Sequence, residues 1–339
     1  MINKLSVIIP ACNEWPQVAF TIRNIAEELD GYIDFEIIVI DNYCEKVFKQ
    51  GYPPDRGHAR YTHPNFKGKV WSAYETLEDG CQHNIGHLQA VAERCSWLKY
   101  VRYEEKLSHW NAKRVGIEQA ATGNILWFCD AHCIITKNTL VRMFKYYVDR
   151  QEEIHGSLHL PLTYHILENR KLIYKLVYNP DAAEIHYSFT GYRDDEFPYE
   201  VPVMSTCGMM ISREIYDKIG GWPKFLGIYG GGENFINFVL AVAGYKKWIF
   251  PGKPLHHHGD KRGYHYEGDD YLKNRMLATY LAAGRRWLTY MIERGKHPTA
   301  LKQRIADQVL ENCWEQRELI KKQLVYPNIE DWIEIWLPK

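Results

Sequence analysis

The chain has 339 residues, of which 46% are hydrophobic and 25% charged, an ordinary composition for a soluble globular protein of one large domain or two smaller ones. Lys plus Arg and Asp plus Glu both number 42, which argues against a strongly basic nucleic-acid binder but is compatible with a local basic groove. No apolar stretch approaches the ~20 residues that span a bilayer, and neither a signal-peptide layout nor a CxxC pair is present. We therefore expect a cytoplasmic protein whose eight Cys are reduced thiols, not a disulfide framework or a zinc site.

The first predicted unit is a strand, a helix and a second strand. Leu5–Pro10 is an apolar strand, Asn13 is placed to cap the helix, and Phe35–Ile40 is the second strand, which ends at Asp41. The helix between them has an apolar stripe made of Val18, Ile22, Ile25 and Leu29. Near-continuous apolar strands joined by a helix favour a parallel sheet that is covered on both faces.

Residues 42–97 show little periodicity, and so long an irregular segment inside a compact domain is usually functional or mobile. Leu98–Arg102 is the next predicted strand. Ser108 is expected to cap a helix over 109–121, and the apolar run 125–129 is expected to form a buried strand.

The second half of the chain contains further predicted helices and strands, one segment without a clear pattern, and a helical C-terminal part. Its predicted elements are helices over 138–148 and 235–243, strands over 203–211 and 248–250, and a short helix capped by Ser212. Residues 151–202 show no clear pattern, although they are rich in aromatic and turn residues. Two amphipathic helices follow residue 266, so we divide the chain into an α/β domain over 1–265 and a C-terminal helical extension over 266–339.

The tetrapeptide Asp130-Ala131-His132-Cys133 stands where the apolar run 125–129 opens into a loop. In an extended segment, residues two apart point the same way, so Asp130 and His132 can ligate one metal ion. A carboxylate and an imidazole suit Mn²⁺, and a metal at a strand's C-terminal edge is placed to hold a diphosphate. This suggests a nucleotide-sugar transferase. Taken alone, the tetrapeptide is better explained as a strand-ending turn in which Asp130 is a cap and His132 is exposed, and only the rest of the chain favours the metal site.

Several motifs in chain order resemble those of the GT-A glycosyltransferases, in particular family 2 enzymes and the polypeptide N-acetylgalactosaminyltransferases. The motifs are Val7–Glu14, Val39–Asn42, Asn111–Arg114 with Gly116, Ala120 and Gly123-Asn124, Asp130–Cys133, Cys207–Met210 and Gly231–Asn234. They cover about residues 5–260. The Asp-x-His form is that of the N-acetylgalactosaminyltransferases, whereas family 2 more often has Asp-x-Asp. The resemblance implies a Rossmann-like GT-A fold with a mostly parallel central sheet flanked by helices.

The resemblance implies that Asp130 and His132 are metal ligands and that a third ligand comes from the run of three histidines after residue 255. In an extended segment His256 and His258 share one face and His257 points away. Similarity to the family's later histidine favours His258, with His256 as the alternate. The expected ion is Mn²⁺ or Mg²⁺, which would bridge the diphosphate of a UDP-sugar and neutralise the leaving nucleotide. A solvent-exposed cluster or an acid–base network is the simpler interpretation of the histidines.

The donor is expected to meet several loops. Asp41 would bind the base or ribose, unless it only caps a strand end. Asn13 would approach the base, although its role as a helix cap competes with this. The complete set of expected donor-binding residues is Pro10, Asn13, Glu14, Asp41, Lys113, Arg114, Asp130, Ala131, Gly231, Gly232, Lys261 and Arg262. The basic residues in this set would contact phosphate or else be ordinary solvated charges.

Glu233 and Asn234 are the expected catalytic pair. In inverting family 2 enzymes, a Glu-Asp pair at this place supplies the base, and Asn cannot take a proton. The pair therefore resembles that of the retaining N-acetylgalactosaminyltransferases, and we expect Glu233 to contact the sugar or to act as base, with a retaining outcome favoured. Its structural alternative is a carboxylate favoured by the dipole at a helix N-terminus.

The expected function is that of a metal-dependent hexosyl- or pentosyltransferase that uses a UDP-sugar. The acceptor hydroxyl would belong to a glycan, a protein or a hydroxymethylated DNA base, and residues 151–202 would face it. One alternative is a catalytically silent GT-A-like module that only binds nucleotide-sugar. Another is a mononuclear metal hydrolase built from Asp130, His132 and the later histidines, which would leave Asp41 and the glycine-rich turn before Glu233 unexplained.

Overall fold

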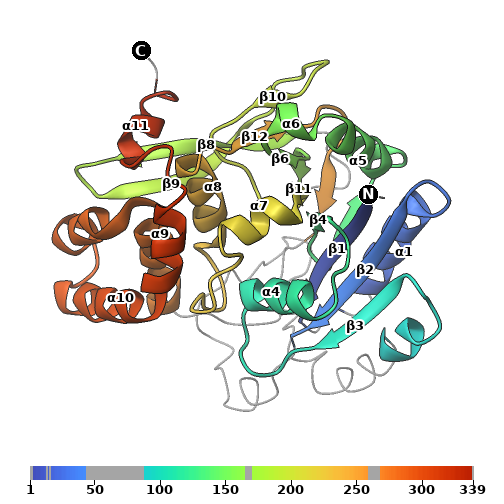
Figure 1. Ribbon diagram of the computed structural model, residues 1–339, viewed down its shortest axis with the longest axis horizontal. Coiled ribbons are helices and arrows are strands. Elements are labelled where there is room, and N and C mark those ends of the chain that lie inside the picture. Colours follow the sequence, from blue (N-terminus) through green and yellow to red (C-terminus); the bar gives the residue numbers. More distant parts are fainter. Residues whose placement is uncertain are drawn as a thin grey trace, which may run out of the picture.

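Four parallel strands lie side by side in the order β4-β1-β2-β3 in the computed structural model, which describes residues 3–12, 14, 17–42, 88–164, 170–258 and 268–337 (Figure 1). Their bounds are Lys4–Ala11 (β1), Asp34–Asp41 (β2), Leu98–Arg102 (β3) and Ile125–Phe128 (β4). β1, β2 and β4 are buried almost throughout, as their near-continuous apolar sequences predicted.

Helices α1 (Gln17–Leu29) and α4 (His109–Gln119) connect these strands. Across the sheet, the chain moves from β1 to β2 in one direction and from β3 back to β4 in the other. Because both connections between parallel strands are expected to be right-handed, α1 and α4 lie on opposite faces of the sheet. α4 begins as predicted, because the Ser108 hydroxyl accepts a hydrogen bond from the Asn111 backbone N–H at 3.2 Å. The predicted cap Asn13, and most of the irregular segment predicted over 42–97, lie outside the described residues.

Four further strands extend the central sheet to the order β10-β12-β6-β11-β4-β1-β2-β3. They are β6 (Gly156–His159), β10 (Tyr199–Glu200), β11 (Met209–Ser212) and β12 (Lys246–Ile249). The helices of this part are α5 (Thr139–Asp149), α6 (Gln151–Ile154), α7 (Arg213–Lys218) and α8 (Gly232–Val242). β6 and β12 are parallel to each other, while β11 is antiparallel to both of its neighbours. The sheet is therefore largely parallel, as expected.

The strand predicted over 203–211 begins only at Met209. The reason is a side chain on α8. Asn237 accepts a hydrogen bond from the Met204 backbone N–H at 2.9 Å and donates one to the Met204 carbonyl at 2.7 Å. The backbone polar groups of Met204 are thus satisfied by this amide and not by a strand ladder.

A second sheet, of five strands in the order β5-β13-β7-β8-β9, starts beside the tetrapeptide that follows β4. Its strands are β5 (Cys133–Ile135), β7 (Leu162–Thr163), β8 (Leu172–Asn179), β9 (Glu184–Gly191) and β13 (Leu255–His257). β8 and β9 form a long antiparallel hairpin within the segment 151–202, for which the sequence predicted no regular element.

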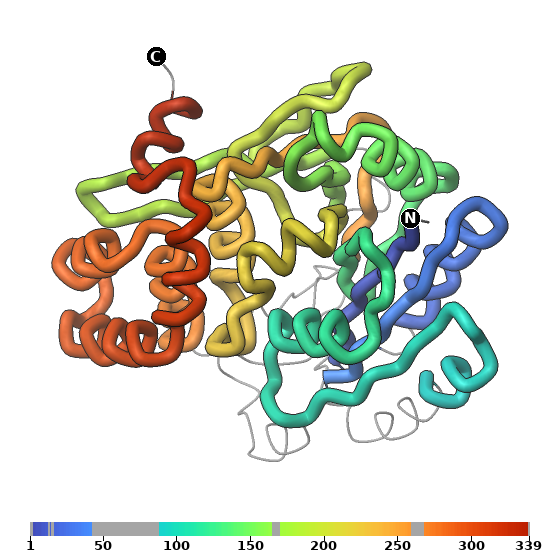
Figure 2. Tube along the Cα trace, in the orientation of Figure 1, coloured from blue at the N-terminus to red at the C-terminus, as the bar shows by residue number. Residues whose placement is uncertain are grey.

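The chain ends in α9 (Gly268–Arg294), α10 (Thr299–Lys321) and the short α11 (Ile329–Ile333), which lie far from β1–β3 (Figure 2). The two predicted helices are present, and the first is broken at Gly284, whose φ is 77°. Arg317 on α10 donates to the Leu281 carbonyl at 2.7 Å beside this break. None of the helices in the described part of the chain is long and apolar enough to cross a membrane. The boundary expected at residue 265 falls outside the described residues, so the division into two domains stays a prediction.

Candidate functional site

Three potential metal ligands converge where the two sheets meet. Asp130 and His132 follow β4, and His257 lies on β13, which pairs antiparallel with β5 so that His257 is opposite Cys133. His257 Nε2 is 3.0 Å from Asp130 Oδ2 and 3.2 Å from His132 Nε2. One ligand atom from each of the three side chains lies within 4.8 Å of the others.

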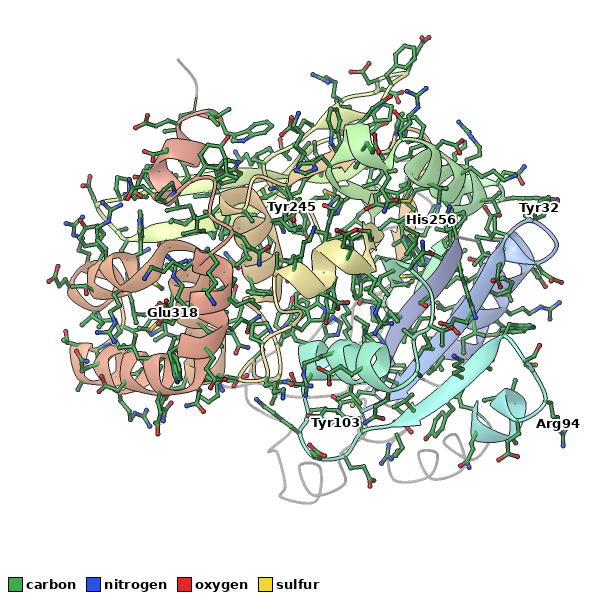
Figure 3. All side chains as sticks on the ribbon, in the orientation of Figure 1. Tyr32, Arg94, Tyr103, Tyr245, His256 and Glu318 are labelled. Carbon is green, nitrogen blue, oxygen red and sulfur yellow. The ribbon has the colours of Figure 1, made fainter. Side chains whose placement is uncertain are left out.

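The histidine that the structure brings to this group is His257, whereas His258 was the expected ligand and His256 its alternate. The expected alternation is present, because the rings of His256 and His258 share the other face of the segment and stack at 6.3 Å (Figure 3 labels His256). The pairing with β5 decides which face meets Asp130. His256 is opposite Ile134, which is 40% exposed, whereas His257 is opposite buried Cys133.

Glu14 fixes the orientation of His132. Its Oε1 is 2.5 Å from His132 Nδ1, and its Oε2 accepts a hydrogen bond from the Cys12 backbone N–H at 3.1 Å. The other ring nitrogen of His132 is thereby directed at His257. Burial lowers the pKa of His132, but the adjacent Glu14 carboxylate outweighs this and raises the pKa to about 9. Glu14 was expected at the nucleobase. The structure instead places it behind a potential metal ligand, the arrangement in which a carboxylate tunes an imidazole.

Asp130 is held in its ionised form by cationic neighbours. Burial alone would raise its pKa, but Lys113, His109 and His257 outweigh burial and keep the pKa of Asp130 well below its usual range. Lys113 Nζ lies 3.7 Å from Asp130 Oδ1 and 5.0 Å from the centre of the Trp110 ring, and its side chain is fully buried. Lys113, expected to contact phosphate, thus faces the carboxylate.

The donor set fits a divalent cation. Two imidazole nitrogens and one carboxylate oxygen lie within 4.8 Å of one another, and the two imidazoles favour a transition-metal ion over Mg²⁺, which prefers oxygen ligands. Within the described ranges, Asp130 Oδ1 is buried and makes no hydrogen bond, although Lys113 Nζ and His109 Nε2 lie 3.7 and 3.5 Å from it. A cation bound closely at this oxygen would satisfy a buried acceptor that lacks a hydrogen bond.

These side chains open onto a cavity of about 340 Å³. Its lining combines the loop after β1, the metal-ligand group, aromatic residues of β7–β9 and the start of α8. The lining residues are Pro10, Ala11, Cys12, Glu14, Asn42, Leu107, His109, Trp110, Asp130, Ala131, His132, Tyr164, Tyr174, Tyr187, Phe189, Ser205, Cys207, Ile228, Tyr229, Glu233 and His257. Of the expected site residues, Pro10, Glu14, Asp130, Ala131, His132 and Glu233 are therefore brought together here.

Glu233 and its neighbour Asn234 point to different places. Glu233 lines the cavity at the first turn of α8 and accepts a hydrogen bond from the Thr206 hydroxyl at 3.2 Å, and burial raises its pKa. Asn234 is only 4% exposed and donates to the Ile185 carbonyl of β9 at 3.3 Å. The expectation of a catalytic Asn234 is corrected, because its amide is directed at the hairpin and not at the cavity.

Two other expected donor-binding residues, Asp41 and Arg114, have structural contacts away from the cavity lining. Asp41 forms an ion pair with Arg102 at 2.8 Å and accepts a hydrogen bond from the Tyr100 hydroxyl at 2.9 Å, whereas the next residue, Asn42, lines the cavity. Arg114 pairs with Glu118 on the same helix. The strand-end and helix-surface alternatives therefore describe Asp41 and Arg114 better.

The glycines before Glu233 allow close packing of the protein on itself. A Cβ on Gly232 would lie 2.3 Å from the Trp110 ring, and one on Gly231, whose φ is 70°, would lie 2.4 Å from the backbone of Asn274. Close approach to a ligand was expected here, but neither glycine lines the cavity. Lys261 and Arg262, like Asn13, lie outside the described residues.

Several cavity residues were not predicted. His109 lies 3.5 Å from Asp130, and Tyr164, Tyr187 and Phe189 come from the segment without a clear pattern. The alternation of aromatic residues at 187 and 189 is a strand signal that could have identified this wall. The sulfur atoms of Cys129 and Cys133 and that of Cys207, which is 74 residues after Cys133, also lie within 4.8 Å of one another.

Comparison with known proteins identifies one family. The profile of the family described as Glycosyl transferase family 2 matches residues 6–46 and 85–220. No curated protein matches the sequence.

Among solved structures, the fold is similar to that of GalNAc-T7 with UDP, GalNAc and Mn²⁺, with a TM-score of 0.59 and 15% sequence identity over 96% of this chain. This chain spans 58% of the length of that structure. A mannosyltransferase of Pyrobaculum calidifontis in complex with GDP-Man and Mn²⁺ has a TM-score of 0.47 and 16% identity, covering 95% of this chain and 74% of its own. Residues 1–349 of S. aureus TarS in complex with UDP have a TM-score of 0.48 and 13% identity, covering 92% and 72%. The GT-A arrangement with C-terminal helices is thus confirmed as the fold.

Proposed function

The chain belongs to glycosyl transferase family 2, and on this premise we propose that it is a metal-dependent enzyme that moves a sugar from a UDP-sugar to an acceptor hydroxyl. One observation carries the proposal. Asp130, His132 and His257 converge at one position of a cavity that Glu233 also lines. A metal-ligand group and a carboxylate that share a cavity are the parts that sugar transfer from a nucleoside diphosphate requires.

The strand order supports a nucleotide site at the ends of β1 and β2. Pro10, Ala11 and Cys12 at the end of β1, and Asn42 after β2, line the cavity. In chain order, β2 and β3 are added on one side of β1 and β4 on its other side, so the strand order reverses at β1. Ligands of open α/β sheets bind at the carboxyl ends of strands at such a point, and this supports a nucleotide there.

The metal ion, proposed to be Mn²⁺, would neutralise negative charge on the diphosphate and on the leaving nucleotide. The protein's own contribution is to keep one metal ligand ionised and to orient another. Lys113 and His109 keep Asp130 ionised, and Glu14 directs the Nε2 atom of His132 at the shared position. A hydrolase built on the same ligands would not account for the family match.

Glu233 is proposed to contact the transferred sugar. Glu14 and Asp130, the other carboxylates among the described cavity residues, are each bonded to a histidine. Asn234 cannot accept a proton and points to β9. We therefore favour retention of the anomeric configuration, which the anomeric coupling constant in the NMR spectrum of the product tests. An inverted linkage would overturn this part of the proposal.

The direct test incubates the purified protein with a panel of UDP-sugars and Mn²⁺ and measures UDP release without an acceptor. Slow hydrolysis of one donor, lost in Asp130→Asn and His132→Ala with circular dichroism unchanged, is the expected result. Donor binding by calorimetry without turnover, even after acceptors are added, would support the catalytically silent binding module. Turnover of only a GDP-sugar would correct the nucleotide, and full activity in excess chelator would contradict the role of the metal.

A further inference from the structure

One wall of the cavity is aromatic and comes from the second sheet. Tyr164 follows β7, Tyr174 lies on β8, and Tyr187 and Phe189 lie on β9. In the strand order β5-β13-β7-β8-β9, the strands β7, β8 and β9 lie on one side of β13, which carries His257. The wall therefore extends from the metal-ligand group on the side of β13 that is opposite to β5.

The rings form a continuous series of contacts. Tyr164 lies 5.2 Å from the His257 ring and 5.5 Å from Phe189, in edge-to-face arrangements. Phe189 lies 5.1 Å from Tyr174, its partner in the strand register. Tyr174 stacks on Tyr187 at 4.6 Å with an interplanar angle of 1°. Tyr187 and Phe189 are two residues apart on one strand, so they share a face.

Phe189 is 53% exposed although it contacts two other rings and lines the cavity. Single exposed apolar residues are common and need no explanation. Here the exposed ring is continuous with three further aromatic side chains that lead to the proposed metal ligand His257. A ligand lying on Phe189 would remove this apolar surface from water.

The wall is held firmly relative to the catalytic side of the cavity. Asn234, the residue after Glu233, donates to the Ile185 carbonyl of β9 at 3.3 Å. Close to the same contact, at the turn of the hairpin, Arg294 of α9 donates to the Pro180 carbonyl at 3.0 Å, and the ring of Tyr178, which pairs with Ile185, lies 6.0 Å from the Trp287 ring. Figure 1 shows the hairpin reaching from the central sheet to the C-terminal helices. The turn end of the hairpin is therefore fixed both to α8 and to α9, and a surface held in place in this way is pre-organised for binding.

We propose that this wall is the acceptor subsite and that the acceptor is a glycan, with the apolar face of a pyranose ring lying on the exposed ring of Phe189, beside the Tyr164 ring that stands edge-to-face to it. The inference rests on the proposed function, since it names the acceptor of that reaction. A pyranose presents a flat patch of C–H groups bordered by hydroxyls. Aromatic faces bind the patch, and the phenol groups of tyrosines are available to the hydroxyls.

The charges of the cavity favour a glycan over a DNA base. In the described part of the chain, no Lys or Arg lines the cavity, and its carboxylates are Glu14, Asp130 and Glu233. Affinity for a nucleic acid comes largely from cations at its phosphates. The exposed segment that follows β9 also offers no net positive charge to a phosphate backbone, because Asp194 pairs with Lys171 and Asp195 with Arg193, and Glu196 adds a further carboxylate.

The test compares Phe189→Ala with Phe197→Ala, a matched control because Phe197 is 72% exposed and lies outside the cavity lining. Saturation-transfer NMR with a panel of oligosaccharides measures acceptor binding whether or not the donor turns over. UDP release without acceptor measures the donor reaction separately. Binding of a hydroxymethylated DNA oligonucleotide and of a Ser/Thr peptide is measured in parallel.

We expect wild type and Phe197→Ala to bind an oligosaccharide through the C–H face of one ring, and Phe189→Ala to weaken that binding about tenfold or more. Equal binding by both variants, or recognition of only the DNA or the peptide, would overturn the glycan assignment while donor hydrolysis stands. A wild-type protein that neither hydrolyses nor binds any donor would instead overturn the proposed function. Glycan binding would then still show whether the aromatic wall is a glycan-binding surface.

Discussion

His132 Nδ1 lies 2.5 Å from Oε1 of Glu14, so the loop after β1 sets the orientation of a proposed metal ligand in the loop after β4. The two residues are 118 positions apart in sequence. This contact joins the expected nucleotide side of the cavity to its metal-ligand group, and it explains how His132 can direct its second nitrogen at His257.

Replacing Glu14 by Gln should weaken Mn²⁺ binding about 10–100-fold, because the neutral amide no longer supports the imidazole electrostatically. The same change should lower the pKa of His132 from about 9 toward its ordinary value. Calorimetry with Mn²⁺ and an NMR titration of the metal-free protein measure the two effects. Glu118→Gln is the control, since Glu118 pairs with Arg114 on an exposed helix face. Unchanged affinity and pKa in Glu14→Gln would contradict the orienting role.

Glu233→Gln and Asn234→Ala should separate the catalytic role of the first residue from the structural role of the second, which binds the β8–β9 hairpin. The first removes the carboxylate in the cavity and should slow transfer about 100-fold or more, with little loss of stability because burial already disfavours the charged form. The second removes the bond to Ile185 and should lower the free energy of unfolding by about 1–2 kcal/mol, with donor hydrolysis little changed. Steady-state kinetics and urea denaturation measure both. A greater loss of donor hydrolysis in Asn234→Ala than in Glu233→Gln would reverse the assignment.

Glu36 gives a prediction about the fold alone. Its buried carboxylate pairs with Lys99 at 2.7 Å and with Lys4 at 3.1 Å. Burial raises its pKa, but hydrogen bonds from Lys99, Ser6 and Thr122 outweigh burial and lower the pKa to about 2.

Because the folded-state pKa of Glu36 is depressed, its contribution to stability is present above the unfolded pKa of about 4.3 and is lost as pH falls through about 2. Glu36→Gln should therefore cost about 3 kcal/mol at pH 7, and the cost should shrink below pH 4.5. Urea denaturation of both proteins from pH 7 to pH 3 measures this. A difference that does not change with pH would show that the ion pairs are not its source.

The first part of the fold could be predicted because its signals are local. Continuous apolar strands, the stripe of α1 and the hydroxyl of Ser108 each act within a few residues. The pairing of Asp130 with His132 was also predictable, since it needs only the alternation of side chains in an extended segment.

The third histidine could not be chosen in this way. Alternation separates His257 from His256 and His258, but only the register of β13 on β5 shows which face meets Asp130. Likewise, Glu14 and Asn234 have partners 118 and 49 residues away, and no local pattern reports them. The sequence therefore identified the chemical types in the site, while long-range pairing decided which atoms meet.

The most direct test of the account is the Mn²⁺ affinity of His257→Ala set against that of His256→Ala, measured by calorimetry and by electron paramagnetic resonance. The two variants remove the same side chain from adjacent positions of β13, on opposite faces. The account predicts that His257→Ala loses Mn²⁺ binding and Mn²⁺-dependent UDP release, while His256→Ala retains both. Loss in His256→Ala with retention in His257→Ala would contradict the proposed metal centre.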